Sequence, residues 1–183
     1  IAIQNKGRLR APSLKFLRSI GLKFKSNDRD LLKRCDNKNV EFLYVRNFDI
    51  PAYVEQNACD FGIVGENVLL ERESKLRIVK KLGFGKCSLI IAVPENKNIK
   101  NISDLEGERI ATSYPNTLKN FLIKNGIKSS VININGSVEI APFLNLADAI
   151  CDITQTGTTL KENGLKIIAK VLDSEAVIIK CPI

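Results

Sequence analysis

Short apolar runs separated by polar turns recur along the whole chain and predict a series of buried strands. Such runs cover residues 1–4, 40–45, 58–65, 76–82, 88–93, 109–112, 131–134, 147–153, 165–171 and 176–180. They are rich in branched and aromatic residues, which favour strands, and they are far too short to cross a bilayer. The hydrophobic pattern therefore predicts a protein built around β-sheets.

Between these runs the apolar positions take helical spacing. The predicted helices cover residues 11–20, 52–56, 114–125, 140–146 and 160–163. Pro51 suits the first position of the second helix, because the N–H that proline lacks is not needed there. Strand, loop and helix follow one another three times, and this order is typical of an α/β fold.

The order of elements favours two α/β lobes with a cleft between them. Pro94 and the polar stretch at residues 95–101 interrupt the pattern after the first group of strands. We expect the last two strands, which are apolar enough for the middle of a sheet, to carry the chain back to the first lobe. The predicted lobes are residues 1–90 with 166–183 (lobe I) and residues 91–165 (lobe II).

The charge of the chain indicates an anionic ligand. Its 183 residues carry a formal net charge of +8, and nucleic acid, phosphometabolites and acidic membranes are all anionic. Aromatic residues make up only 6% of the chain, and no zinc-finger spacing, basic-region heptad or ribonucleoprotein-type strand is present, which disfavours nucleic acid. We therefore predict a phosphorylated small molecule as the ligand, with neither nucleic acid nor membrane as a partner.

The cysteines and the absence of histidine exclude several kinds of site and mechanism. The five cysteines are far apart and form no C-x-x-C pair, so the sequence predicts neither a disulfide framework nor a zinc site. The chain has no histidine, which excludes Ser-His and Cys-His nucleophilic schemes. No signal peptide precedes the first strand, and we expect a cytoplasmic protein.

The segment from Asp152 to Leu160 is the most informative part of the sequence. An acidic residue ends a predicted strand, and a hydroxyl-rich loop containing Gly157 then begins a helix. The N–H groups and hydroxyls of such a loop, together with the helix dipole, can bind phosphate. An ordinary threonine N-cap without a ligand is the alternative. Asp148 or Asp152 is a candidate to meet ribose hydroxyls or a hydrated Mg²⁺.

Charged side chains also follow the first two predicted strands, where open α/β folds place their ligands. Lys6, Arg8 and Arg10 could engage a pyrophosphate group, although a solvated basic loop would have the same sequence. Arg46 follows the second strand, and a surface ion pair with Asp49 is its alternative role.

Two further strand ends carry candidates in lobe II. Glu139 could accept hydrogen bonds from an adenine amino group or a ribose hydroxyl, or it could complement a helix dipole. Ser113 and Tyr114 could line the cleft, or they could be a capping serine and a packed ring.

Together these segments resemble the ATP phosphoribosyltransferase family, which catalyses the first step of histidine biosynthesis. The resemblance spans almost the whole chain. The matching segments are Lys6-Gly7-Arg8-Leu9, Arg46 with Asp49-Ile50-Pro51, Asp60-Phe61-Gly62-Ile63-Val64-Gly65, Arg109 to Pro115, Gly136 to Pro142, Leu146-Ala147-Asp148, and Asp152 to Leu160 with Asn163-Gly164-Leu165. Two positions depart from the family: Asn145 stands where glycine is usual, and Gln155 enlarges the start of the phosphate loop.

The resemblance implies a two-lobed fold like that of type II periplasmic binding proteins, with the active site in the cleft between the lobes. The residues implied to bind phosphoribosyl pyrophosphate are Asp152, Thr154, Gln155, Thr156, Gly157, Thr158 and Thr159. The residues implied to bind ATP are Arg8, Arg46, Asp60, Tyr114 and Glu139. Catalytic stabilisation of the departing pyrophosphate is implied for Arg46, Lys6 and Arg8.

In the implied reaction, N1 of adenine attacks C1 of the ribosyl group and displaces pyrophosphate. Negative charge builds on the leaving group, where Arg46, Lys6 and Mg²⁺ bound through substrate phosphates would stabilise it. Positioning and electrostatics then matter more than a protein base, so the absence of histidine is no obstacle.

The length resembles that of short-form members, which work with a regulatory subunit similar to histidyl-tRNA synthetase. Family members continue beyond the position of Pro182-Ile183 with at least another helix, and residues 82–87 look more like long-form sequences. We expect the short-form catalytic unit, in a homo-oligomer or in a hetero-oligomer with that regulatory subunit. The alternative function is a non-catalytic small-anion-binding protein of the same two-lobe fold, since a fold does not fix a function.

Overall fold

The computed structural model describes residues 1–27 and 29–182. The chain divides into two compact units, one formed by residues 1–86 together with the stretch from Ser174 onward, and one formed by residues 87–173. It therefore passes from one unit to the other twice, after Lys86 and after Asp173. No helix within the described residues is long and apolar enough to span a membrane.

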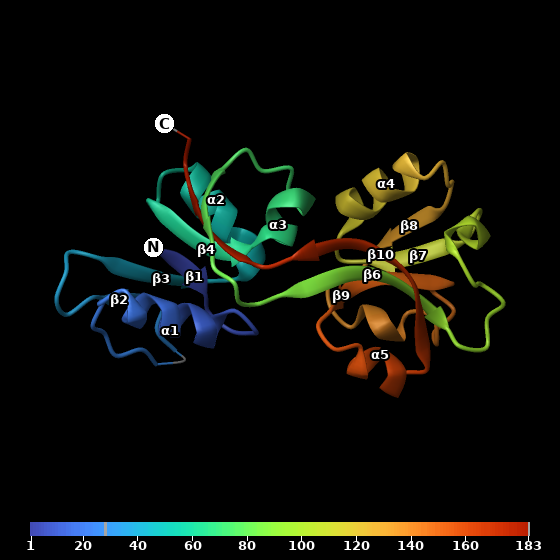
Figure 1. Ribbon diagram of the computed structural model, residues 1–183, viewed down its shortest axis with the longest axis horizontal. Coiled ribbons are helices and arrows are strands. Elements are labelled where there is room, and N and C mark those ends of the chain that lie inside the picture. Colours follow the sequence, from blue (N-terminus) through green and yellow to red (C-terminus); the bar gives the residue numbers. More distant parts are fainter. Residues whose placement is uncertain (28, 183) are drawn as a thin grey trace. The chain divides into compact units, whose positions relative to one another are not determined.

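The described residues of the first unit form a six-stranded sheet in the order β2-β3-β1-β4-β11-β5. Figure 1 labels β1, β2, β3 and β4 of this sheet. β1 runs parallel to β3 and β4, whereas β11 runs antiparallel to β4 and β5. The elements of this unit are β1 (Ala2–Gln4), α1 (Arg10–Ser19), β2 (Leu32–Arg34), β3 (Glu41–Val45), η1 (Asn47–Asp49), α2 (Ile50–Glu55), β4 (Phe61–Gly65), α3 (Glu66–Glu71), β5 (Arg77–Lys81) and β11 (Ala176–Lys180).

Both faces of the central strands of this sheet are buried. Side chains alternate along a strand, so Ala2 lies in one buried cluster with Val54 of α2, while Ile3 lies in another with Leu17 of α1. Helices on both faces explain why the central strands β4 and β11 are nearly continuous apolar runs instead of alternating ones. Each fully buried aliphatic side chain contributes about 1.5–3 kcal/mol to stability.

The described residues of the second unit form a five-stranded sheet in the order β10-β6-β9-β7-β8. β9 runs parallel to β7 and antiparallel to β6, and β8 runs parallel to β7. The elements are β6 (Cys87–Pro94), η2 (Ile102–Leu105), β7 (Arg109–Thr112), α4 (Pro115–Lys124), β8 (Ser130–Asn133), η3 (Val138–Ile140), β9 (Ala149–Thr154), α5 (Thr158–Glu162) and β10 (Leu165–Ser174).

The division between the units falls at other residues than the predicted boundaries at 90/91 and 165/166. β6 pairs with β9 from Ser88 onward, so the whole strand belongs to the second unit. β10 is an edge strand of the second sheet and not a central one, and the chain rejoins the first unit only at Ser174. The apolar content of these strands could not reveal where the boundary between the units lies. It indicates that a strand is buried, but it does not indicate which strand it pairs with.

The helix predicted at residues 140–146 is wrong. The structure has η3, which ends at Ile140, followed by consecutive turns. Asn145 has a φ of 55°, which an α-helix does not allow. This left-handed conformation also explains the departure from glycine at position 145, because asparagine is one of the few other residues that tolerate it.

One strand and one α-helix were not predicted from the sequence. β2 covers three residues at the sheet edge, and its first and last residues are exposed, so it carries little hydrophobic signal. α3 begins directly after β4, and its six residues are too few to show a helical period in the hydrophobic pattern.

Candidate functional site

The hydroxyl-rich loop lies at the carboxyl end of β9. The Gly157 N–H donates to the Thr154 hydroxyl oxygen at 2.9 Å, and the Thr156 and Thr158 hydroxyls lie 3.0 Å apart. Gly157, with φ 76°, is the N-cap of α5. Because the N-cap has no side chain, the alternative of an ordinary threonine N-cap does not describe this loop. α5 has only five residues, so its dipole adds little, and the hydroxyls and N–H groups carry most of the anion-binding capacity.

Asp152 lies two residues before the end of β9, beside this loop. Its Oδ1 accepts a hydrogen bond of 2.7 Å from the Ile153 N–H. Burial, opposed by that hydrogen bond and assisted by the charge of Glu139, raises the pKa of Asp152 to about 6. The structure thus brings two of the predicted residues, Asp152 and Glu139, within electrostatic range of one another.

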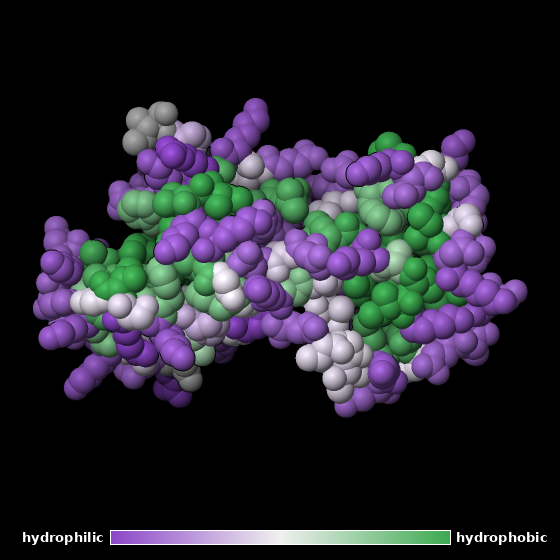
Figure 2. All heavy atoms as spheres, viewed as in Figure 1, coloured by the Kyte–Doolittle hydropathy of each residue, from purple (hydrophilic) through white to green (hydrophobic). Residues whose placement is uncertain are grey.

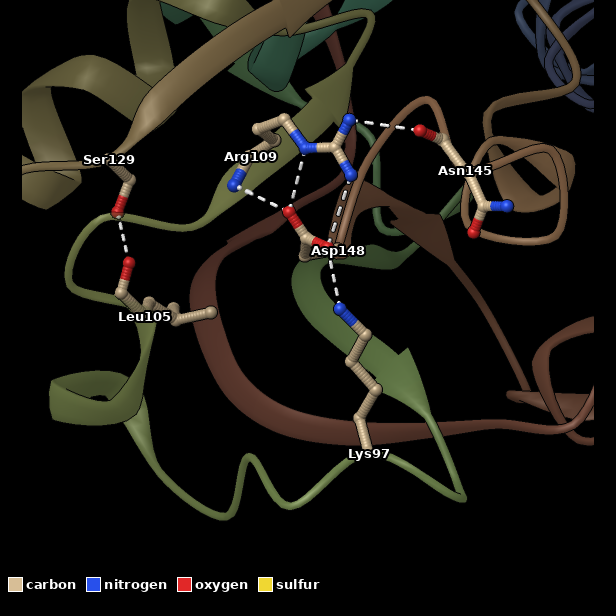
Figure 3. A network of polar contacts seen from close by, with 6 residues as sticks. All are labelled: Lys97, Leu105, Arg109, Ser129, Asn145 and Asp148. Carbon is tan, nitrogen blue, oxygen red and sulfur yellow. Dashed lines mark hydrogen bonds and ion pairs between the residues drawn. The ribbon is translucent and has the colours of Figure 1, made fainter.

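Asp148 belongs to a different environment, at the amino end of the same strand. Its carboxylate accepts hydrogen bonds from the Arg109 guanidinium at 2.9 Å and from Lys97 (Figure 3). Hydrogen bonds from Arg109, with a smaller contribution from Lys97, hold the pKa of Asp148 well below its usual range. Because both oxygens are engaged, this side chain is a structural anchor, and its geometry disfavours contact with ribose or a metal ion.

Tyr114 and Ser113 follow β7, at the same sheet edge as the phosphate loop, because β7 and β9 are parallel. Tyr114 is only 5% exposed, and the Ser113 hydroxyl donates to the Ile134 carbonyl at 2.6 Å. The geometry favours the packed-ring alternative for Tyr114 and a role for Ser113 in joining the segments that follow β7 and β8.

In the first unit, the predicted basic residues gather at one sheet edge. β1 and β3 are adjacent parallel strands, so Lys6, Arg8 and Arg46 follow strands that end side by side. The Asn5 N–H donates to the Val45 carbonyl at 2.8 Å and ties the two loops together. Such an edge is where open α/β sheets bind ligands.

These basic side chains are not equivalent. Lys6 and Arg46 are exposed, and Arg46 makes no ion pair with Asp49, so that alternative is wrong. Arg8 is half-buried and donates to the Gly85 carbonyl at 2.6 Å. Arg10 donates to the Asn27 carbonyl, and its guanidinium lies 4.9 Å from the Tyr44 ring centroid, which makes it a packing residue.

Asp60 lies away from the other predicted ATP-binding residues of this unit. It precedes β4, which runs parallel to β1, so it lies at the amino end of a strand whose neighbours carry Arg8 and Arg46 at their carboxyl ends. There it lines a cavity of about 570 Å³ with Cys59. The structure does not bring Asp60 together with the basic cluster.

Asn47 is a candidate that the sequence reasoning missed. Its amide oxygen is buried and has no hydrogen-bond partner within the described residues. Buried polar atoms normally have a partner, and Asn47 directly follows Arg46 at the basic edge. Its position after a strand was the only signal that could have identified it.

Searches of solved structures identify the class of fold. The chain is similar to the Escherichia coli periplasmic aliphatic sulphonate binding protein SsuA, with 16% identity and a TM-score of 0.62 over 98% of this chain and 63% of that chain. That likeness shows the fold alone. The chain is thus a two-lobed α/β protein of the periplasmic-binding-protein type, as predicted.

Sequence comparisons identify the family. Residues 46–182 match the HisG family model, described as ATP phosphoribosyltransferase. The Cytophaga hutchinsonii ATP phosphoribosyltransferase is 47% identical over 182 residues, which are 100% of this chain and 64% of that protein. The Maricaulis maris enzyme is 43% identical over 186 residues, covering 98% of this chain and 63% of that protein. The chain belongs to the ATP phosphoribosyltransferase family and spans less than two thirds of the length of these relatives.

A solved family structure agrees with this assignment. The ATP phosphoribosyl transferase (HisG:HisZ) complex from Thermotoga maritima is 32% identical and has a TM-score of 0.84, covering 99% of this chain and 86% of that chain. Family membership confirms the predicted resemblance.

Proposed function

We propose that this protein is the catalytic unit of an ATP phosphoribosyltransferase. The reaction joins N1 of the adenine of ATP to C1 of phosphoribosyl pyrophosphate, while the bond from C1 to pyrophosphate breaks and the leaving group keeps the electron pair. The products are N1-(5-phosphoribosyl)-ATP and pyrophosphate, in the first step of histidine biosynthesis. The observation that supports this most is the loop from Thr154 to Thr159 in a chain of this family.

The loop suits the 5-phosphate of phosphoribosyl pyrophosphate. Thr156, Thr158 and Thr159 supply hydroxyl donors around Gly157, whose left-handed backbone lets a phosphate approach closely. Asp152 and Glu139 lie near this loop and, when ionised, accept hydrogen bonds from ribose hydroxyls or an adenine amino group. Fixing the ribose in one orientation supplies the positioning part of catalysis.

The basic edge of the first unit suits the polyphosphate groups. Lys6 and Arg46 are exposed and can stabilise negative charge on triphosphate or pyrophosphate. Arg8 is held by the Gly85 carbonyl through one of its nitrogens, so its remaining donors keep a fixed direction.

Mg²⁺ is proposed as an ion carried by the substrate. Within the described residues, no group of three or more His, Cys, Asp or Glu side chains could hold a metal ion. Mg²⁺ is commonly bound by one or two carboxylates together with substrate phosphates and waters, and Asp152, acting through water, fits this pattern. The ion would neutralise charge on the departing pyrophosphate. Asp148 does not fit, because Arg109 and Lys97 occupy its oxygens.

Assembly is also part of the proposal. The relative from Thermotoga maritima is a HisG:HisZ complex, and we propose that this chain forms a homo-oligomer, or a hetero-oligomer with a regulatory subunit of that kind. A cytoplasmic location stays a prediction.

Turnover separates an enzyme from an anion-binding protein of the same fold. The purified protein is incubated with ATP, phosphoribosyl pyrophosphate and Mg²⁺, and pyrophosphatase is added to pull the reaction. Formation of the N1-ribosylated adenine is followed by ultraviolet absorbance, with a parallel reaction that contains the regulatory subunit. Product that requires both substrates supports the enzyme. Binding of either anion without pyrophosphate release in both reactions would support the alternative.

A further inference from the structure

The head group of Arg8 is oriented by a neutral partner. Charged and polar residues are spread over the face of the molecule drawn in Figure 2, so a cation near the surface does not by itself mark a site. The Arg8 guanidinium donates to the Gly85 carbonyl at 2.6 Å, and among the described residues no carboxylate forms an ion pair with it. A neutral acceptor fixes the direction of the group without neutralising it, so the full charge remains for an anion.

The rest of the first unit adds to this positive charge. The first unit holds 19 Lys and Arg against 11 Asp and Glu, a net charge of +8, whereas the second unit holds nine of each and is neutral. An anion is therefore attracted to the first unit as a whole. The residues around Arg8 can then contribute by fixing its N–H donors in one direction.

The loop that supplies the carbonyl has room only for glycine where it meets the residue after Arg8. Gly85 has a φ of 64°, and a Cβ on it would lie 2.2 Å from Cδ2 of Leu9, which is fully buried. The Ala176 N–H donates to the Phe84 carbonyl at 2.9 Å and ties the loop to β11. A side chain at position 85 would therefore move the carbonyl away from Arg8.

A second glycine, at the end of β4, leaves space beside the other terminal nitrogen of the guanidinium. A Cβ on Gly65 would lie 3.7 Å from Nη2 of Arg8 and 2.3 Å from Oδ1 of Asn67. Gly65 has a φ of −72°, so its backbone does not require glycine. Asn67 is buried, its Oδ1 accepts from the Ser174 hydroxyl at 2.9 Å, and its N–H donates to the same oxygen at 3.0 Å. This reciprocal pair holds the Asn67 side chain in place.

We propose that two glycines and one buried polar pair position Arg8 for the polyphosphate of ATP. The glycines are Gly65 and Gly85, and the pair is Asn67 with Ser174. The carbonyl of Gly85 orients one nitrogen, and the pair bounds the open space beside the other. The remaining N–H donors of Arg8 then keep the fixed geometry that suits a phosphate group. This inference deepens the proposed function, since it rests on contact between Arg8 and ATP.

Two glycines of the same loop give a matched test. Gly85→Ala displaces the carbonyl that holds Arg8, so KM for ATP should rise about tenfold while KM for phosphoribosyl pyrophosphate does not change. Gly83→Ala is the control, because Gly83 has a similar φ of 73° and nothing lies within 4 Å of its added Cβ. Its KM for ATP should stay within about twofold of the original value. Equal KM values for ATP in the two variants would overturn the role of Gly85.

Two glycines of β4 test the space beside the guanidinium. Gly65→Ala should push Asn67 toward Arg8 and raise KM for ATP severalfold. Gly62→Ala also crowds its surroundings, because its Cβ would lie 2.7 Å from Ile50, but those surroundings are apolar core. Thermal unfolding measures how far each variant is destabilised. An equal rise in KM for Gly62→Ala would show that destabilisation alone causes the effect, and would overturn the role of Gly65.

The buried pair is tested without adding an atom. Ser174→Ala removes the hydroxyl that holds Asn67, so the side chain can turn and KM for ATP should rise severalfold. This variant introduces no steric clash, so it keeps the inference testable if the alanine variants of the glycines do not fold. An unchanged KM for ATP would overturn the role of the pair.

A double-mutant cycle separates positioning from the proposed function. Arg8→Ala with unchanged kcat and KM for ATP would remove Arg8 from the proposed site and overturn the inference with it. If Arg8→Ala weakens ATP, Gly85→Ala in that background should add no further loss. A full second loss would show that Gly85 acts without Arg8, and would overturn positioning alone. Calorimetric titration with ATP gives the same comparison without turnover, so a protein that binds ATP but forms no product contradicts only the proposed reaction.

Discussion

The two units offer anions different kinds of site. The first unit carries the whole net charge of the protein, and its candidate residues are cationic side chains at the carboxyl ends of β1 and β3. The second unit is neutral, and its candidates are hydroxyls and N–H groups around Gly157 with two carboxylates nearby. Flexible cations suit a polyphosphate with several charges, whereas a shaped loop suits one phosphate joined to a ribose.

Net charge and loop geometry therefore indicate two different sites for anions. The basic pI indicates an anionic ligand but reflects only the first unit. The phosphate loop contributes nothing to the net charge. If the two kinds of site take different parts of the substrates, substitutions in them should affect different kinetic constants.

The largest effect is expected at the basic edge. Arg46→Ala removes an exposed cation that stabilises charge on the departing pyrophosphate, and kcat should fall by about 10²-fold. Arg34→Ala is the control, because Arg34 is also exposed but pairs with Glu41 at the sheet edge. Steady-state kinetics with both substrates varied measure the change. A kcat within twofold of the original enzyme would remove Arg46 from the mechanism.

A smaller effect, on a different constant, is expected in the loop. Gly157→Ala must hold φ 76° against a Cβ, at a cost of about 1–2 kcal/mol. The loop should shift, and KM for phosphoribosyl pyrophosphate should rise about tenfold. Gly126→Ala, at φ 68° after α4 and with equally open surroundings, should cost similar stability without changing KM. Equal KM values for the two variants would contradict the role of the loop.

The ionised carboxylate of Asp152 should lower the stability of the folded protein and strengthen the binding of phosphoribosyl pyrophosphate. Its pKa is raised from 3.8 to about 6 on folding, so the folded protein binds more protons between these values, and its stability falls as the pH rises through this window. At pH 7 the ionised carboxylate costs up to about 3 kcal/mol. Asp152→Asn should therefore be more stable than the original protein at pH 7 and equal to it near pH 3.5, yet bind phosphoribosyl pyrophosphate more weakly. Urea unfolding at both pH values measures this, and a variant less stable at pH 7 would contradict it.

Asp148, in contrast to Asp152, should contribute to stability and not to substrate binding. Asp148→Asn loses the charge that Arg109 and Lys97 share, and because those partners are half-exposed the loss should be only about 1–2 kcal/mol. KM for phosphoribosyl pyrophosphate and the Mg²⁺ dependence of the rate should not change. A rise in the Mg²⁺ concentration needed for half-maximal rate would show that Asp148 takes part in Mg²⁺ binding and would contradict this prediction.

Much of the fold could be predicted from the sequence, because strand, loop and helix signals were local. The apolar run at 88–93 identified β6 as a strand, but its pairing with β9 depends on residues about 60 positions away, and the unit boundary was misplaced for this reason. The helix predicted at 140–146 failed at Asn145, whose left-handed φ is a property of the folded backbone.

The sequence predicted the position of some candidate site residues but not of others. Position after a strand correctly grouped Lys6, Arg8 and Arg46, because parallel neighbours end at one edge. Asp60 and Asp148 precede their strands, so they lie at the opposite ends of β4 and β9 from these edges. The missing partner of Asn47 and the packing of Tyr114 are consequences of burial, which the pattern at a single position does not encode.

Hydrogen exchange with one substrate at a time tests most directly which unit takes which anion. Amide exchange of the protein is followed by mass spectrometry with phosphoribosyl pyrophosphate and Mg²⁺, and separately with ATP. Phosphoribosyl pyrophosphate should protect the amides of residues 154–159, and ATP should protect those following β1 and β3. Binding of phosphoribosyl pyrophosphate that leaves residues 154–159 unprotected would contradict it.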